Sequence, residues 1–230
     1  MARPQAVLFD AGETLFREVP ARQEIYAAAA REFGLEVDAA QVGAAMRAAH
    51  ETLPREIEGH FRYTEGWFRT FIESVFIPLG LTRDIERLQE RLIGTFGRAD
   101  TFVPFDETRA VLKRLKGAGL KLAVVSNWSP RLPALLSGLG LAGDFQVIVS
   151  SSILRAEKPE PAIFRRALEQ LGLEAERCLH VGDHPVKDYA GARALCIQAR
   201  LLDRERRYPR HPDRIESLSE ILDLFELPRI

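Results

Sequence analysis

The stretch Ala6-Val7-Leu8-Phe9-Asp10-Ala11-Gly12-Glu13-Thr14-Leu15 runs from four apolar residues into a carboxylate, a small-residue turn and a threonine. A short apolar run of this kind predicts a buried strand, which places Asp10 at the carboxyl end, where open parallel sheets bind their ligands. Asp and Gly are also common turn formers. From this stretch alone, Asp10 is either a nucleophile that also holds a metal ion or an ordinary turn residue, so the rest of the chain must decide.

Length and composition predict a globular protein with no general attraction to polyanions. The chain has 230 residues and is 46% hydrophobic, enough for one substantial core and a smaller second one. Its 32 basic and 33 acidic residues leave a formal charge of -1, so we expect neither nucleic acid nor a membrane as a partner. The arginine-rich segment 203–214 also holds acidic residues, and we interpret it as a solvated connector rather than a docking patch for an anionic partner.

The start of the chain and its cysteines predict a cytoplasmic protein. The apolar run before Asp10 is too short for a signal peptide, and no apolar segment reaches membrane-spanning length. Cys178 and Cys196 lie in apolar contexts without the spacing of a zinc site or a disulfide framework. We expect both to be buried thiols in a reducing compartment.

Residues 17–101 are predicted to form a helical insert. Apolar residues recur there at helical spacing in four stretches separated by Pro and Gly, with almost no strand signal. The four apolar stripes are Ile25, Ala28, Ala29 and Phe33; Val42, Ala45, Met46 and Ala49; Trp67, Phe68, Phe71, Val75 and Phe76; and Ile85, Leu88, Leu92 and Ile93.

After the insert, strand and helix patterns alternate. Strands are expected at 120–125, 145–149, 178–181 and 197–201, and helices at 111–115, 130–139, 161–171, a short stretch through 190, and 215–225. Asp213-x-x-Glu216 is spaced like a capping box for the last helix. This alternation predicts an α/β fold, a Rossmann-like doubly wound parallel sheet covered on both faces. The core then comprises residues 1–16 and 102–230, and the inserted four-helix cap comprises residues 17–101.

Reactive side chains follow the predicted strands, and they should meet at one edge of the sheet. Three carboxylates in one crevice are costly without a cation, and a set of oxygen ligands suits Mg²⁺. A lysine and a hydroxyl would then face an anionic group, which predicts a site for phosphoryl transfer. The residues are Asp10 after the first strand, Ser126 and Asn127 after the second, Lys158 in the loop beyond the third, Asp183 after the fourth, and Asp188 shortly beyond.

These residues also resemble, in order, the four motifs of the haloacid dehalogenase superfamily. The matches are Asp10-x-x-x-Thr14-Leu15, Ser126-Asn127, Lys158-Pro159-x-x-x-Ile163-Phe164 and Gly182-Asp183-x-x-x-x-Asp188. The helical insert resembles that superfamily's cap of the first type. Stretches 126–164 and 180–191 are most similar to the haloacid-dehalogenase-like hydrolase domain-containing protein three group. The resemblance covers nearly the whole chain, and four ordered motifs are far more specific than one.

The resemblance implies a role for each matching residue. Asp10 would attack phosphorus, form an aspartyl-phosphate and bind Mg²⁺ together with the Gly12 carbonyl. Asp183 would be a direct ligand, whereas Asp188 would ligate the ion, orient a bound water or pair with Lys158. The remaining roles are hydrogen bonding to the phosphoryl group by Ser126, charge neutralisation by Lys158, and substrate contact by Thr14 and Asn127.

Gly12 departs from the pattern of the superfamily's phosphatases. These usually carry a second aspartate two residues after the first, which protonates the leaving group and then activates water. Glycine has no side chain to move a proton, and loss of a general acid/base commonly costs about 10²- to 10⁴-fold in rate. Glu13 and His184 are weak candidates to replace it, and each is otherwise a polar loop residue.

Three functions remain open. The first is a Mg²⁺-dependent phosphatase of a small phosphorylated metabolite, slow or restricted to good leaving groups. The second is a metal-independent 2-haloacid dehalogenase, which has no need of the acidic set around Asp183. The third is a regulatory module that keeps the phosphate and metal pocket without turnover. Phosphonate-cleaving relatives rely on a cap lysine, and residues 19–101 contain none.

The insert is expected to determine substrate choice. Its most polar and aromatic part contains four residues that are candidates to face the crevice, although Trp67 at this spacing is typical of a core residue. Phe68, Phe71 and Phe76 pack either within the cap or across a dimer contact, so the chain is a monomer or a homodimer. The four candidates are His60, Arg62, Tyr63 and Trp67.

Overall fold

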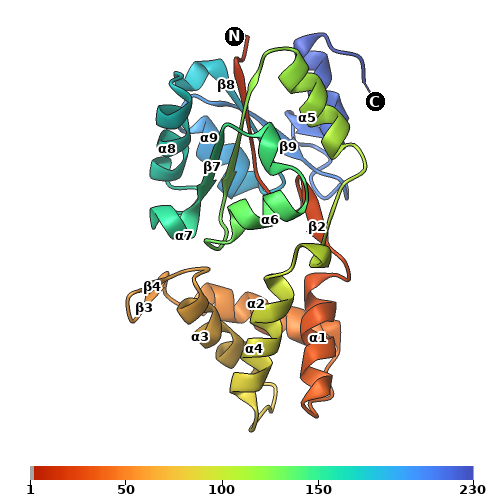
Figure 1. Ribbon diagram of the computed structural model, residues 1–230, viewed down its shortest axis with the longest axis vertical. Helices are drawn as coiled ribbons and strands as arrows, with labels where there is room; N and C mark the ends of the chain where they lie inside the picture. The colour runs from red at the N-terminus through yellow and green to blue at the C-terminus, as the bar shows by residue number, and fades with distance from the viewer. Residues whose placement is uncertain (1–2, 230) are drawn as a thin grey trace.

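A six-stranded sheet forms the centre of the computed structural model, which describes residues 3–229 (Figure 1). Its strand order is β10-β9-β8-β1-β6-β7, and every pairing is parallel. The chain lays β6 and β7 on one side of β1 and β8 to β10 on the other, so the strand order reverses between β1 and β8. Open sheets bind ligands at such a reversal. The strands are β1 (Ala6–Phe9), β6 (Lys121–Ser126), β7 (Val147–Ser150), β8 (Cys178–Gly182), β9 (Gln198–Leu202) and β10 (Arg214–Ile215).

Helices cover both faces of this sheet because the central strand is apolar on both sides. Val7 and Phe9 pack into one hydrophobic cluster with α5 (Thr108–Gly117), α6 (Leu132–Gly138) and the 3₁₀ helix η5 (Leu218–Phe225). Ala6 and Leu8 pack into another with α8 (Pro161–Leu171) and α9 (Gly191–Arg193). Alternate residues of a strand point to opposite faces, so β1 joins the two clusters. The predicted doubly wound α/β fold is confirmed.

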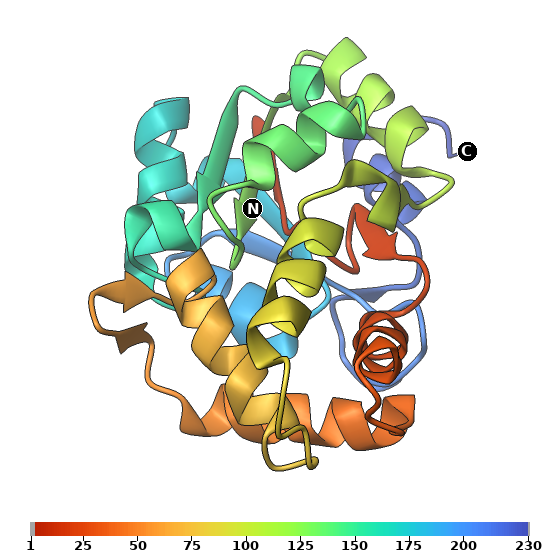
Figure 2. The ribbon, with the colours of Figure 1, turned by 60° about the horizontal axis from the view of Figure 1, so that its bottom comes forward.

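Four helices form a separate bundle below the sheet, which we call the cap (Figures 1 and 2). They enclose their own hydrophobic cluster, which includes Trp67 and Phe76. The chain enters and leaves the cap through β2 (Phe16–Glu18) and β5 (Phe102–Pro104), which pair antiparallel. The sequence pattern missed one cap element, the short hairpin of β3 (Glu56–Ile57) and β4 (His60–Phe61). The cap helices are α1 (Arg22–Glu32), α2 (Ala39–Thr52), α3 (Glu65–Phe76) and α4 (Ile85–Phe96).

The prediction for the last helix is wrong at its start. Arg214 and Ile215 form β10 beside Leu201 and Leu202, so the helix begins only at Leu218 and is 3₁₀. Its capping box is formed by Ser217 and Glu220 rather than by Asp213 and Glu216. The Asp213 carboxylate instead accepts hydrogen bonds from Tyr189 (2.6 Å) and Arg200 (3.3 Å).

Two burial predictions also fail. Cys196 is exposed, because it lies in the turn between α9 and β9 with a φ of 63°, whereas Cys178 is buried. In α1, Ala28 faces solvent, and Tyr26 and Ala30 are buried instead. The remaining short elements are α7 (Ser151–Leu154), η1 (Ala99–Thr101), η2 (Ala142–Asp144), η3 (Ala175–Arg177) and the π-helical turn η4 (Pro185–Ala190).

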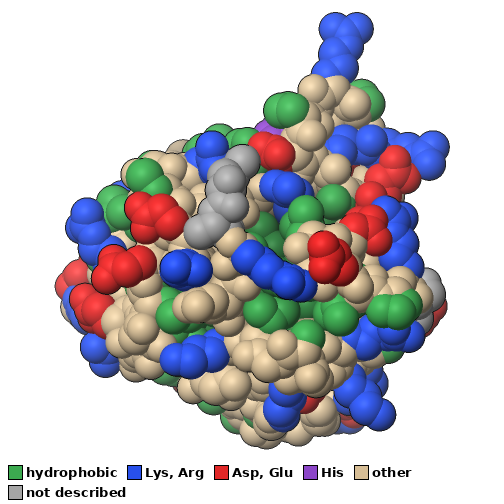
Figure 3. All heavy atoms as spheres, turned by 90° about the horizontal axis from the view of Figure 1, so that it is seen from above, with side chains coloured by type: hydrophobic (Ala, Val, Ile, Leu, Met, Phe, Trp, Pro, Cys, Tyr) green, Lys and Arg blue, Asp and Glu red, His purple; other side chains and the backbone are tan. Residues whose placement is uncertain are grey.

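The face of the molecule seen in Figure 3 is not dominated by charge of one sign. That view looks onto the core from above, and basic and acidic side chains lie interspersed there. Within residues 3–229, none of the helices combines the length and apolar character that crossing a membrane requires.

Candidate active site

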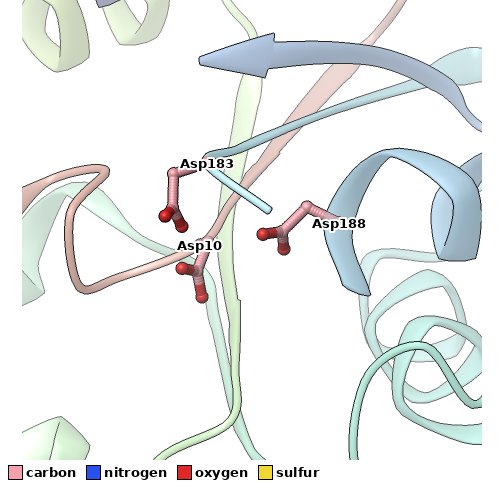
Figure 4. Close-up of side chains that lie close together, drawn as sticks. All are labelled: Asp10, Asp183 and Asp188. Carbon is pink, nitrogen blue, oxygen red and sulfur yellow. The ribbon is translucent and has the colours of Figure 1, made fainter. Parts of the chain in front are cut away.

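Three aspartates converge where β1 and β8 end (Figure 4). Each offers a carboxylate oxygen, and these atoms all lie within 4.8 Å of one another. Asp10 follows β1 directly, and its N–H donates to Val181 of β8 at 2.9 Å. Asp188 can approach the sheet because residue 182 is glycine: a Cβ there would lie 2.3 Å from the Asp188 carboxyl carbon. Asp10, Asp183 and Asp188 line a cavity of about 390 Å³.

Lys158 is the cation that lies between the aspartates of this cavity, and it is 3% exposed. Its Nζ donates to Asp10 Oδ1 and to Asp188 Oδ1, both at 2.5 Å. Burial opposes the charged ammonium, but the charges of the two aspartates outweigh it and raise the pKa of Lys158. The Asn127 side chain fixes the Lys158 backbone by accepting from its N–H (2.7 Å) and donating to its carbonyl (3.1 Å). Asn127 therefore holds the lysine in place from the end of β6.

His180 was not predicted as a site residue, yet it contacts the site directly. It is fully buried in β8, and its Nε2 lies 3.0 Å from Asp188 Oδ1. Burial opposes ionisation of Asp188, but Lys158 and the hydrogen bond from His180 lower its pKa, so the carboxylate accepts and Nε2 donates. The backbone N–H of His184 donates to the other oxygen, Oδ2, at 3.1 Å. Both oxygens of Asp188 are thus engaged, and it pairs with Lys158, one of the three roles considered for it.

Asp183 is an aspartate of this site whose pKa is raised. Burial, followed by the negative charges of Asp10 and Asp188, raises its pKa to about 7. A cation bound between these carboxylates would offset the repulsion, and hard oxygen donors suit Mg²⁺. The donor set fits such an ion best at Asp10 and Asp183, because Asp188 already has three protein partners. Arg207 Nη2 approaches Asp183 to 4.0 Å from the segment 203–214, so this connector is not merely solvated.

The other predicted residues divide into two groups. Ser126 and Gly12 line the cavity with Asp10. Thr14 does not: it is fully buried in the turn after β1, and its Oγ1 is without a hydrogen-bond partner in the described structure. The sequence pattern also missed Trp128, which follows Asn127 and covers Gly12, so that a Cβ on Gly12 would lie 2.9 Å from the indole Cζ3.

Both candidates for the missing acid/base line the cavity. Burial and the nearby Glu18 raise the pKa of Glu13, which favours a protonated carboxyl. His184 is less suited to donate a proton, because its Nδ1 accepts from the N–H groups of Val186 (3.1 Å) and Lys187 (3.2 Å). Burial and the charge of Lys187 lower the pKa of His184, which keeps the ring neutral.

The cap contributes Arg22 and Tyr63 to the cavity. Burial and the charge of Glu157 raise the pKa of Tyr63 to about 12, so its hydroxyl stays protonated beside His50 Nε2, 3.1 Å away. The other three cap candidates lie elsewhere: Trp67 in the cap core, His60 on the exposed hairpin, and Arg62 against Glu157. Phe71 and Phe76 are buried in the cap, so they pack within it.

Comparison with known proteins places this geometry in context. Residues 4–195 match the family model described as haloacid dehalogenase-like hydrolase. The haloacid dehalogenase-like hydrolase domain-containing protein 3 of Danio rerio is 34% identical over 213 residues, which cover 90% of this chain and 88% of the relative. A HAD phosphatase of Thermococcus onnurineus aligns with a TM-score of 0.67 at 26% identity, covering 98% of this chain and 100% of the other. A 2-haloacid dehalogenase of Pseudomonas syringae aligns with a TM-score of 0.70 at 25% identity, covering 97% and 98%.

Proposed function

Since this chain belongs to the haloacid dehalogenase-like hydrolases, we propose that it is a Mg²⁺-dependent phosphatase of a small phosphorylated metabolite. The reaction would proceed through an aspartyl-phosphate on Asp10. The observation that carries this proposal is the convergence of Asp10, Asp183 and Asp188 with the buried Lys158 in one cavity. A nucleophile that attacks carbon needs no such acidic set, so the proposal favours phosphatase over dehalogenase.

Asp10 and Asp183 are the side chains that would hold Mg²⁺, together with the Gly12 carbonyl. When bound, the ion supplies positive charge that offsets the negative charge of the carboxylates and of the phosphoryl oxygens. The raised pKa of Asp183 supports this assignment, because burial and then the charges of Asp10 and Asp188 disfavour its ionised form, and a bound cation would favour that form again.

The chain's own residues would position the reaction. Lys158 holds the Asp10 carboxylate through Oδ1 and places positive charge beside the phosphoryl group. Asp188, with His180 behind it, fixes the lysine from the other side. Ser126, the last residue of β6, lines the cavity, where its hydroxyl would donate to a phosphoryl oxygen. Attack by Asp10 forms the P–O bond to the enzyme as the ester P–O bond breaks, and water later hydrolyses the aspartyl-phosphate.

Protonation of the leaving group is the step for which this site has no assigned residue. Position 12 has no side chain, and the Trp128 indole fills the place where one would begin. A second candidate function follows from this observation: a phosphate- and metal-binding regulatory module that does not turn over. Turnover of esters with good leaving groups separates the two functions.

The test is phosphate release from p-nitrophenyl phosphate and from a panel of phosphorylated metabolites, with and without Mg²⁺. We expect release that depends on Mg²⁺ and is lost in Asp10→Asn. No release above Asp10→Asn from any ester, combined with Mg²⁺-dependent binding of inorganic phosphate, would support the regulatory module. Chloride release from 2-haloacids without metal would overturn both.

A further inference from the structure

A second cavity, of about 320 Å³, opens beside the catalytic one between cap and core. The two cavities share four lining residues, Arg22, Tyr63, Asn127 and Trp128. A molecule with its phosphoryl group at Asp10 would therefore pass Trp128 and extend into this second cavity. The volume is at the lower end for small-ligand sites, enough for one or two fused rings. We call it the aromatic cavity, after its lining residues Tyr26, Phe68, Phe96, Phe102 and Trp128.

These five rings pack against one another across the interface of cap and core. Trp128 lies 5.9 Å from Phe102, Phe102 lies 6.5 Å from Phe96, and Phe96 lies 5.5 Å from Tyr26, measured between ring centroids. Phe68 completes the wall at 6.3 Å from Phe96. Rings held in a fixed network offer apolar faces and edges to a further ring with little ordering cost.

The charged residues around the aromatic cavity are already paired within the protein. Arg22 Nε donates to Glu18 at 2.9 Å, and its guanidinium lies 5.8 Å from the Trp128 ring centroid. Arg131 contacts Glu65 at 3.4 Å. Because these cations have acidic partners, an occupant need not bring a charge of its own into this cavity. The cavity thus suits an apolar group whose only charge is the phosphate it carries into the catalytic site.

The chemistry at Gly12 points to the same class of molecule. With no side-chain acid at position 12, the site favours an ester whose oxygen can leave as an anion. A phenol has a pKa near 10, as in Tyr, whereas a hydroxyl of water-like acidity has one near 16, so a phenolate leaves far more readily. We propose that the aromatic cavity binds the leaving group of an aryl phosphate monoester, which makes aryl phosphates the preferred substrates. This inference rests on the proposed phosphatase function.

The proposed step is balanced without a proton donor. Asp10 supplies the electron pair of the new bond to phosphorus, and the aryl P–O bond breaks with its pair remaining on the phenolate oxygen. The phenolate takes its proton from solvent after release. Water then cleaves the aspartyl-phosphate and regenerates Asp10 with inorganic phosphate as the second product.

The first test measures binding without turnover. In Asp10→Asn with Mg²⁺, calorimetry compares 1-naphthyl phosphate with glycerol 3-phosphate. We expect the naphthyl ester to bind at least about tenfold more tightly, and Phe68→Ala to remove about that factor. Phe68→Leu, which keeps an apolar side chain, guards against misfolding and should lose less. Phe33→Ala is the matched control, since Phe33 is another half-buried cap phenylalanine packed on the same cluster but does not line the aromatic cavity.

The second test separates this inference from the function it rests on. Acetyl phosphate has a good leaving group but no ring, so its hydrolysis needs Asp10 and not the aromatic cavity. We expect kcat/KM for 1-naphthyl phosphate to fall about tenfold in Phe68→Ala, with acetyl phosphate unchanged. Two outcomes overturn the inference and leave the phosphatase standing, provided that acetyl phosphate is hydrolysed. One is that 1-naphthyl phosphate is not preferred over glycerol 3-phosphate. The other is that Phe33→Ala lowers kcat/KM for 1-naphthyl phosphate as much as Phe68→Ala does. No hydrolysis of either ester overturns both.

Discussion

Gly12 and Trp128 lie against each other in the lining of the catalytic cavity. A Cβ on Gly12 would lie 2.9 Å from Cζ3 of the indole, closer than packing allows. Trp128 is itself held at 5.6 Å from the Phe16 ring and 5.9 Å from Phe102, edge-on to the first and tilted to the second. The absence of an acid at position 12 is therefore built into the packing, because the space for its side chain is taken.

Restoring the acid should thus require two changes. We expect Gly12→Asp alone to lower the unfolding free energy by about 1–3 kcal/mol through overpacking, with little gain in rate. Gly12→Asp combined with Trp128→Leu opens the space, and should hydrolyse an alkyl phosphate about tenfold faster than either single variant. Steady-state kcat for glycerol 3-phosphate measures this, with Trp128→Leu as the control. A full gain in Gly12→Asp alone would mean that the indole moves aside at no cost.

The Asp183 carboxylate should destabilise the metal-free protein at neutral pH. Its pKa in the folded state is about 7, above the ordinary 3.8. A raised pKa favours the folded state below pH 4, and this contribution is lost as pH rises from about 4 to 7. Without metal at pH 8, Asp183→Asn should therefore be more stable than the wild type by about 1–3 kcal/mol. The Asp183 side chain is 25% exposed, so solvent screens part of this effect.

Metal should reverse this order. Mg²⁺ raises the melting temperature of the wild type, because binding to the folded state alone stabilises it, and we expect Asp183→Asn to lose most of that response. Thermal melts at pH 5 and pH 8, with EDTA or with Mg²⁺, give four melting temperatures for each of the two proteins. A wild type that melts at the same temperature with and without Mg²⁺ at pH 8 would count against a metal site here.

The fold was largely predictable from the sequence because its strands are apolar and its turns are marked by Gly and Pro. The sheet and the four cap helices could be predicted because apolar spacing and Gly and Pro are features of the local sequence. The start of the last helix was mispredicted because Arg214 and Ile215 gain parallel partners in β9, a long-range pairing that overrides local capping spacing. Cys196 was predicted to be buried because its sequence neighbours are apolar. Such neighbours do not show that the residue lies in a turn, where it is exposed.

The candidate site was predictable only where polar residues follow strands. Asp10, Ser126, Lys158 and Asp183 satisfied that rule and line one cavity. His180 lies inside an apolar strand, where a single histidine is typical of the core, so only its contact with Asp188 reveals its place. Thr14 follows the rule but is fully buried and does not line the cavity. Side-chain direction after a strand depends on the loop, which the pattern does not specify.

His180 should act by positioning Asp188 rather than by touching substrate. In His180→Leu, Asp188 loses a donor but keeps Lys158, so we expect the unfolding free energy to fall by about 1–3 kcal/mol and kcat to fall with KM little changed. His180→Gln places an amide N–H near the position of Nε2 and should recover most of kcat. Kinetics on p-nitrophenyl phosphate with chemical denaturation of both variants tests this. Equal kcat in the two variants would assign His180 to packing alone.

Arg62 and Glu157 join the cap to the loop that carries Lys158. Their atoms Nη1 and Oε1 lie 3.2 Å apart, with the side chains only 12% and 10% exposed. Arg62 also donates to the carbonyl of Leu53 at 3.0 Å, and Glu157 has Arg55 as a second partner at 3.4 Å. Removal of either partner should leave a buried charge short of its main counter-ion.

A double-mutant cycle with Arg62→Met and Glu157→Gln measures this coupling by urea denaturation. We expect an interaction energy of about 1–3 kcal/mol, because a buried pair is little screened by solvent. The matched control is the pair Arg91 and Glu32 within the cap, 2.9 Å apart with both side chains 47% exposed. An exposed pair of that kind should give about 0.5 kcal/mol or less. Equal coupling in the two cycles would show that burial of the pair Arg62 and Glu157 adds nothing to its strength.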